Sequence, residues 1–177
     1  MMIEPIEIEY SLKFETDLNI INGSGRIYTY LDDEYEEETS IGHLSFNYYN
    51  GFELGDELLL AADAVSGDEL YMVNTLLEND FEYDMRLVTL DQITINKQFY
   101  TEELEKEILE SFIQYCKYMM LDYLLVIATN PQKGSKQGVL EFPHLKLYKE
   151  FGFENIGGSE NQSPVMLKSL GENFYEW

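Results

Sequence analysis

Cysteine, histidine and basic residues are scarce in this sequence of 177 residues. Cys116 is the only cysteine, so neither an intrachain disulfide nor a cysteine-based zinc site can form. His43 and His144 are the only imidazoles, so a histidine-based catalytic dyad or triad must use one of them. Eleven Lys and Arg stand against 34 Asp and Glu, which gives a formal net charge of −23. This charge opposes direct contact with a nucleic-acid backbone or with an anionic membrane surface.

Long apolar runs are also missing. No stretch approaches the roughly 18 consecutive apolar residues that indicate a transmembrane helix. The first residues, Met1–Pro5, lack the apolar region of a signal peptide, and we therefore expect a protein of the reducing cytoplasm. What the sequence does have is 45% hydrophobic and 14% aromatic residues, a composition typical of a globular protein. The length fits one domain with its own core.

The negative charge is concentrated in the first half of the chain. No Lys or Arg occurs between Arg26 and Arg86, and this span holds 16 acidic residues. Its densest run contains six acids: Asp32, Asp33, Glu34, Glu36, Glu37 and Glu38. The run lacks the alternating acids and closing Glu of a calcium loop, so we predict no metal site. A solvated hairpin loop and a surface that binds a basic partner are the two interpretations. We divide the single domain, 1–177, into an acidic half, 1–84, and a second half, 85–170.

Hydrophobic periodicity predicts a chain of strands and helices. Alternating apolar residues indicate strands over 6–12, 26–31, 41–49, 85–96 and 164–170. The glycines of Asn22–Gly25 predict a turn between the first two strands. Short helices are expected at 56–64, 68–77 and 143–151.

The long helix and the strand after it give the clearest patterns. Thr101 to Tyr118 carries an apolar stripe at every fourth residue, formed by Leu104, Ile108, Phe112 and Cys116. Thr101 is placed to cap this helix. Leu121–Ala128 is continuously apolar, which is typical of a strand buried on both faces beside a parallel neighbour.

The second half resembles the GNAT superfamily of N-acetyltransferases. The resemblance covers Leu87 to Leu170 and rests on two pieces. One is the strand Leu90–Asn96 with the long helix after it, and the other is Leu145–Phe153, which is similar to the family's LYEKxGF helix end. The resemblance implies an α/β (α+β) domain with a mixed, mostly antiparallel central sheet flanked by helices and splayed where acetyl-CoA enters. The two early helices depart from the family's order, because they are expected after the third strand.

The resemblance also implies site residues. Tyr148 matches the tyrosine that protonates the departing CoA thiolate in active family members, and a phenol suits that role at neutral pH. A core tyrosine is the alternative. Asp91 is the nearest candidate for a general base, with an exposed strand residue as the alternative. Cofactor contacts are implied at Ile95 and Asn96 on the long strand, and at Asn130, which otherwise is a turn residue before Pro131.

The family's pyrophosphate loop is altered in this chain. In the family an R/Q-x-x-G-x-G/A segment begins the long helix, and its backbone N–H groups bind the phosphates. The matching segment here runs from Tyr100 through Thr101 to Glu105, with Tyr100 at the arginine position and Glu103 and Glu105 at the small positions. A carboxylate near a phosphate is repelled by about 1 kcal/mol in water and several times that near a protein surface. We therefore predict a degenerate loop.

Two functions remain open from the sequence. The first is an acetyl-CoA-dependent N-acyltransferase that acts on a cationic amine or a basic protein drawn in by the negative field. The second is a non-catalytic acidic binding protein, of which one form is a nucleic-acid mimic that presents carboxylates in place of phosphates to a basic partner. An exposed strand edge would also allow a homodimer. The fold by itself does not decide between these functions.

Overall fold

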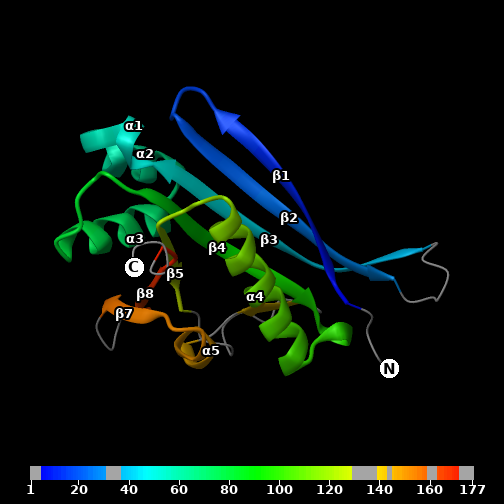
Figure 1. The fold of residues 1–177 in the computed structure, drawn as a ribbon. Coiled ribbons are helices and arrows are strands. Elements are labelled where there is room, and N and C mark those ends of the chain that lie inside the picture. Colours follow the sequence, from blue (N-terminus) through cyan, green and yellow to red (C-terminus); the bar gives the residue numbers. More distant parts are fainter. Residues whose placement is uncertain (1–4, 31–36, 129–138, 143–144, 159–162, 172–177) are drawn as a thin grey trace, which may run out of the picture.

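The computed structural model describes residues 5–30, 37–128, 139–142, 145–158 and 163–171. Its strands form one sheet, and helices lie on both faces (Figure 1). The strands are β1 (Glu7–Glu15), β2 (Ile20–Tyr30), β3 (Glu38–Asn50), β4 (Arg86–Asn96), β5 (Tyr123–Ile127), β6 (Val139–Phe142), β7 (Glu154–Gly157) and β8 (Val165–Ser169). The helices are α1 (Gly51–Leu54), α2 (Leu58–Val65), α3 (Gly67–Glu78), α4 (Glu102–Tyr118) and α5 (Leu145–Glu150), with short 3-10 turns η1 (Gly55–Glu57) and η2 (Lys97–Phe99).

The sheet is mixed and mostly antiparallel, as predicted. Its strands follow the order β1-β2-β3-β4-β5-β8-β7, and β6 joins it beside β4. Among the described strands, β4 and β5 form the one parallel pair, and the other neighbours are antiparallel. This pairing confirms the parallel neighbour expected for the apolar run Leu121–Ala128. The strands β1 and β7 form the two outer edges.

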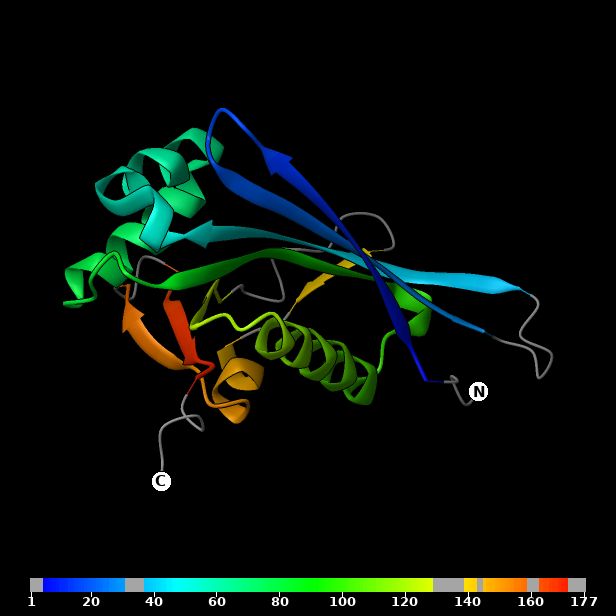
Figure 2. The ribbon, with the colours of Figure 1, turned by 45° about the horizontal axis from the view of Figure 1, so that its top comes forward.

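Each face of the sheet has its own core. The predicted stripe of α4 is confirmed, because Leu104, Ile108, Phe112 and Cys116 are all buried against one face. On the other face α2 and α3 bury a second apolar cluster, at one end of the sheet (Figure 2). Burial of one large aliphatic or aromatic side chain stabilises the fold by roughly 1.5–3 kcal/mol. These two cores therefore attach the helices to the sheet and set the positions of their first turns.

The turn predicted at Asn22–Gly25 is wrong, because these residues lie inside β2. The chain instead turns before Ile20, where Asn19 has a positive φ of 56°. The glycines serve packing: a Cβ on Gly23 would lie 2.1 Å from the ring of Phe46. The absence of a side chain at Gly23 thus lets an aromatic ring of β3 lie directly on β2.

The order of elements is predicted well in the first half and incompletely in the second. The early helices follow β3, as expected. The predicted second half omitted β6 and β7, and each of these strands is only four residues long. Such strands are too short to show a clear alternation in the sequence. Pro143 and His144, placed in the predicted last helix, lie outside the described residues.

Candidate functional site

The long strand β4 loses its parallel neighbour halfway along its length. Its pairing with β5 ends at Leu90 and Val126. The register against β3 shifts at the same point, because Ser45 lies opposite Gln92 while Phe46 lies opposite Leu90. Asp91 is therefore the extra residue of a β-bulge, which increases the local twist of a strand. The second half of β4 continues to Asn96 apart from β5, at the place where the resemblance puts the cofactor.

The strand β6 pairs with this second half of β4. The pairs run antiparallel from Ile93 opposite Phe142 to Asn96 opposite Val139. Ile95, at one of the implied cofactor positions, lies opposite Leu140 in this pairing. The side chain of Ile95 is fully buried in the core. The side chain of Asn96 donates a hydrogen bond to the carbonyl of Ser40 at 3.2 Å. Both residues are thus engaged by the chain itself.

The first turn of α4 is capped from within. The Thr101 hydroxyl accepts a hydrogen bond from the Leu104 N–H at 3.0 Å, which confirms the predicted cap. Glu105 is buried, and one of its carboxylate oxygens accepts a hydrogen bond from the Tyr100 hydroxyl at 2.9 Å. Burial, and next the hydrogen bond to Glu105, raise the pKa of Tyr100 to about 12. Tyr100 therefore remains a proton donor to Glu105 at neutral pH. Glu103, in contrast, points into solvent.

A shallow pocket lies between the first turn of α4 and α5. It encloses about 50 Å³ and is lined by Glu102, Glu105, Lys106, Lys146, Leu147 and Glu150. Lys106 and Glu150 form an ion pair across it at 3.5 Å. The lining thus carries three carboxylates and two ammonium groups. This balance disfavours a doubly charged pyrophosphate, and the volume is far below the roughly 300–1,000 Å³ typical of ligand sites.

Tyr148 lies in the core behind this pocket. Gly152 has a positive φ of 84°, which turns the chain after α5 so that the Phe153 ring packs 4.9 Å from the Tyr148 ring. The phenol is almost fully buried. Burial, and then the charge of Glu105, raise its pKa well above the ordinary value. The hydroxyl therefore stays protonated at neutral pH, as a proton donor must, but it is packed as a core residue.

Asp91 and Tyr148 lie on opposite faces of the sheet. Leu44 and Phe46 pack into the core beneath α4, so Ser45 between them points to the opposite face of the sheet. The exposed carboxylate of Asp91 accepts a hydrogen bond from the Ser45 hydroxyl at 3.1 Å, on that opposite face. Tyr148 belongs to the core on the α4 side. The sheet therefore separates the two residues that the resemblance implied as base and acid.

A buried carboxylate on α3 was missed by the sequence analysis. Glu69 is 1% exposed and accepts hydrogen bonds from Thr89 at 2.5 Å, Tyr49 at 2.7 Å and Asn47 at 3.0 Å. Burial raises the pKa of Glu69, while the three donors act in the opposite direction. Its N–H also donates to the capping Ser66 hydroxyl at 3.1 Å. The cluster attaches the beginning of α3 to the middle of the sheet. A signal was present in the sequence: Asn47 and Thr89 each stand between two apolar or aromatic residues of their strands.

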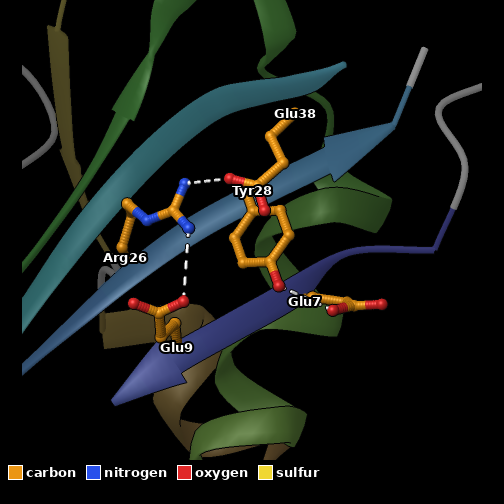
Figure 3. Close-up of polar contacts among 5 residues, drawn as sticks. All are labelled: Glu7, Glu9, Arg26, Tyr28 and Glu38. Atoms are coloured by element: carbon orange, nitrogen blue, oxygen red, sulfur yellow. Dashed lines mark hydrogen bonds and ion pairs between the residues drawn. The ribbon is translucent and has the colours of Figure 1, made fainter. Parts of the chain in front are cut away.

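The acids predicted to bind a partner are only partly described by the structure. Of the six predicted partner-binding acids, Asp32, Asp33, Glu34 and Glu36 lie outside the described residues, as does Asn130. Glu37 and Glu38 are exposed. Arg26 forms ion pairs with Glu38 at 2.8 Å and with Glu9 at 3.3 Å (Figure 3). Tyr28 beside it donates a hydrogen bond to Glu7 at 2.7 Å. This end of β1–β3 is therefore partly neutralised.

The larger unneutralised surface is the layer formed by α1, α2, α3 and the segment that follows them. Within the described ranges, the exposed carboxylates of this layer have no basic side chain at ion-pair distance. They are Glu53, Asp56, Glu57, Asp63, Asp68, Glu78, Asp80, Glu82 and Asp84. We call this set the acidic layer. No three of its acids, nor any other described His, Cys, Asp or Glu residues, come together as a metal site. None of the described helices is long and apolar enough to cross a membrane.

Comparisons with known proteins give structural likenesses and no sequence relatives. No family model matches the sequence, and no curated protein matches it. A solved bacterial toxin has a TM-score of 0.50 at 13% identity, over 85% of this chain and 69% of its own. The mosquito protein named arylalkylamine N-acetyltransferase like 5b has a TM-score of 0.51 at 10% identity, over 83% of this chain and 74% of its own. Arabidopsis thaliana NAA60 in complex with acetyl-CoA has a TM-score of 0.47 at 12% identity, over 93% of this chain and 99% of its own. The chain therefore has a GNAT-like fold.

Proposed function

We propose that this protein is a non-catalytic binding protein built on the GNAT-like fold, and that its acidic layer binds a basic partner. The observation that carries this proposal is the buried Glu105 carboxylate, held by Tyr100 at the beginning of α4. In the family that the sequence resembles, this turn offers small residues and free N–H groups to a pyrophosphate. Here it presents a carboxylate instead, so acetyl-CoA does not fit in the family's manner.

The pairing of β6 with β4 supports the same conclusion. The backbone of Ile93–Asn96 is paired with Val139–Phe142, at the point where β4 has parted from β5. A cofactor that entered the splay would have to displace β6 and break this ladder. Each lost backbone hydrogen bond costs about 0.5–1.5 kcal/mol unless the ligand replaces it. The chain thus fills with its own strand the place that an acyl carrier would need.

The charge distribution supports a basic partner. The acidic layer presents its carboxylates to solvent with no described Lys or Arg at ion-pair distance, and residues 27–85 contain neither residue type. Such a field attracts cations and raises the association rate with a positively charged surface. Partners with a Lys/Arg groove that binds phosphates are included, because spaced carboxylates imitate the charge of a nucleic-acid backbone.

A pull-down from a cell lysate at increasing salt tests this proposal. The matched control replaces four acids of the layer by their amides, Glu53→Gln, Asp56→Asn, Glu57→Gln and Asp63→Asn. All four side chains are exposed, so the control keeps the fold. We expect the natural protein to retain a basic protein at low salt and to release it as added salt screens the charges. We expect the control to retain much less of that protein at low salt. Equal capture by both proteins, or capture of no basic protein at any salt, would contradict the proposal.

The second candidate is an N-acyltransferase, and Tyr148 is the observation that favours it. Its phenol stays protonated and its position in the Leu-Tyr-Lys-Glu-Phe-Gly-Phe string matches the family's proton donor. The test is an acetylation assay with acetyl-CoA and a panel of amines, in which Tyr148→Phe is the comparison. Turnover that falls sharply in Tyr148→Phe would establish the enzyme. Absence of turnover with every amine would favour the binding protein.

A further inference from the structure

A groove separates the β1–β2 turn from the first helices. It is lined by Asp17, Leu18, Leu54, Glu57, Leu60 and Ala61. Figures 1 and 2 both show that this turn and α1–α2 lie at the same end of the sheet, away from the beginning of α4. The groove is therefore distinct from the region where a GNAT cofactor would bind.

The lining combines an apolar floor with an acidic rim. Leu54 and Ala61 are buried beneath it, at 5% and 6% exposure. Leu60 at the edge is 70% exposed, which is high for a leucine beside a groove. Asp17 and Glu57 both line the groove and are exposed, and they come from different elements, the turn and η1. The described basic side chain closest to Asp17 in sequence, Lys13, is paired with Glu15 at 2.9 Å.

The size of the groove restricts its occupant. It encloses about 180 Å³. Sites for cofactors and metabolites usually measure about 300–1,000 Å³, so this groove suits a single side chain. A long cationic side chain matches both parts of the lining, because its methylene stem covers apolar surface while its charged end stays at the rim.

We propose that the groove receives an arginine side chain from the basic partner of the acidic layer. The stem would pack on Leu54 and Leu60, and the guanidinium would lie between the carboxylates of Asp17 and Glu57. Arginine is favoured over lysine because its planar guanidinium offers donors to two carboxylates at once. The inference rests on the proposed function and names the point at which the partner is anchored.

The test measures binding of a fluorescently labelled octa-arginine peptide at low salt by anisotropy. Two variants change the groove, Leu60→Ser and Glu57→Gln. Two matched variants change the same helical layer outside the groove, Ala64→Ser and Asp63→Asn. All four positions are exposed, and a thermal melt of each variant confirms the fold. We expect each groove variant to weaken binding about fivefold and Ala64→Ser to change it by less than about twofold. Asp63→Asn removes an acid of the layer outside the groove, and we expect it to weaken binding less than Glu57→Gln does.

The outcomes separate this inference from the function on which it rests. If Glu57→Gln and Asp63→Asn weaken binding equally and Leu60→Ser has no effect, the protein responds only to total charge. The proposal that the groove receives an arginine is then wrong, while the proposal that the acidic layer binds a basic partner stands. If the natural protein does not bind octa-arginine at low salt, both proposals fail. An octa-lysine peptide that binds as tightly as octa-arginine would overturn the choice of arginine.

Discussion

The hydroxyl of Tyr100 donates a hydrogen bond to the buried carboxylate of Glu105 across the first turn of α4, with 2.9 Å between the oxygens. Tyr100 lies directly before the capping Thr101. Glu105 is the first acidic residue of α4 whose side chain is buried. The pair therefore occupies, with the chain's own atoms, the end of the helix that attracts anions.

This pair predicts a pH effect on Tyr100. Its pKa is raised to about 12, and Glu105 is a named cause after burial. In the unfolded chain the pKa of this phenol is near 10, below its value in the folded protein. The raised pKa therefore stabilises the fold fully below pH 10, and this stabilisation is lost as pH rises from about 10 to about 12. Replacement Glu105→Gln keeps an acceptor oxygen and removes the charge. We expect the pKa of Tyr100 to fall toward 10 in this variant, as measured by NMR of the labelled tyrosine ring.

The control for this prediction is Glu103→Gln. Glu103 lies in the same turn but is exposed and is not a cause of the shift. Its replacement should leave the titration of Tyr100 unchanged. If Tyr100 titrates at the same pH in Glu105→Gln as in the natural protein, the described contact does not exist in solution.

The buried cluster around Glu69 predicts a second pH effect. Burial raises the pKa of Glu69 above its ordinary value near 4.5, so the folded protein favours the neutral carboxyl. The stability that the neutral form contributes is fully present below pH 4.5 and is lost as pH rises through the raised pKa. Glu69→Gln stays neutral at every pH and keeps hydrogen-bonding atoms toward Asn47 and Tyr49. We expect the free energy of unfolding of Glu69→Gln, relative to the natural protein, to increase from pH 4 to pH 7. Urea unfolding at both pH values measures it, and a constant difference would contradict the account.

Removal of the whole Glu69 side chain should be far more damaging. Glu69→Ala leaves the donors of Asn47 and Tyr49 buried without their acceptor, and Thr89 keeps only its longer hydrogen bond to the Asn47 carbonyl at 3.5 Å. Each unsatisfied buried group costs about 1–3 kcal/mol, so we expect a total loss of roughly 3 kcal/mol or more. The exposed Asp68→Ala on the same helix is the comparison, with an expected change below about 1 kcal/mol. A loss of similar size in both variants, by urea unfolding, would show that the cluster has no special role.

The glycines of β2 provide a test of the packing explanation. Gly23→Ala would place a Cβ within 2.1 Å of the Phe46 ring, so the ring must move, at a cost of about 1–3 kcal/mol. Gly67→Ala at the beginning of α3 meets no atom within 4 Å and should stabilise the helix by up to about 1 kcal/mol. Thermal unfolding compares the two variants. Equal stabilities would contradict the close contact between β2 and β3.

Regular patterns predicted most of the fold, and close contacts explain where prediction failed. The stripe of α4 and the apolar run Leu121–Ala128 are long, and each has a period that belongs to one structure. Gly23 was predicted to lie in a turn because a glycine that permits a turn and a glycine that permits a ring to approach look the same in sequence. The strands β6 and β7 were missed because four residues carry no clear period.

The candidate site was less predictable than the fold. The resemblance placed Glu105 at the beginning of the long helix, but it could not show that the Glu105 carboxylate is buried and accepts a hydrogen bond from Tyr100. It also could not show that Asp91 and Tyr148 lie on opposite faces, because a bulge at Asp91 alters which residues of β4 share a face. Glu69 lies in the first turn of α3, and its burial follows from the packing of α3 on the sheet, which the pattern of the helix by itself does not show.

Isothermal titration of the protein with acetyl-CoA tests the central claim most directly. The claim is that the beginning of α4 and the paired edge of β4 exclude the cofactor in the family's manner. We predict no saturable heat at acetyl-CoA concentrations up to about 1 mM, which corresponds to a binding free energy weaker than about −4 kcal/mol. Saturable binding of one acetyl-CoA per chain with a Kd below about 100 μM, and its displacement by CoA, would contradict the account.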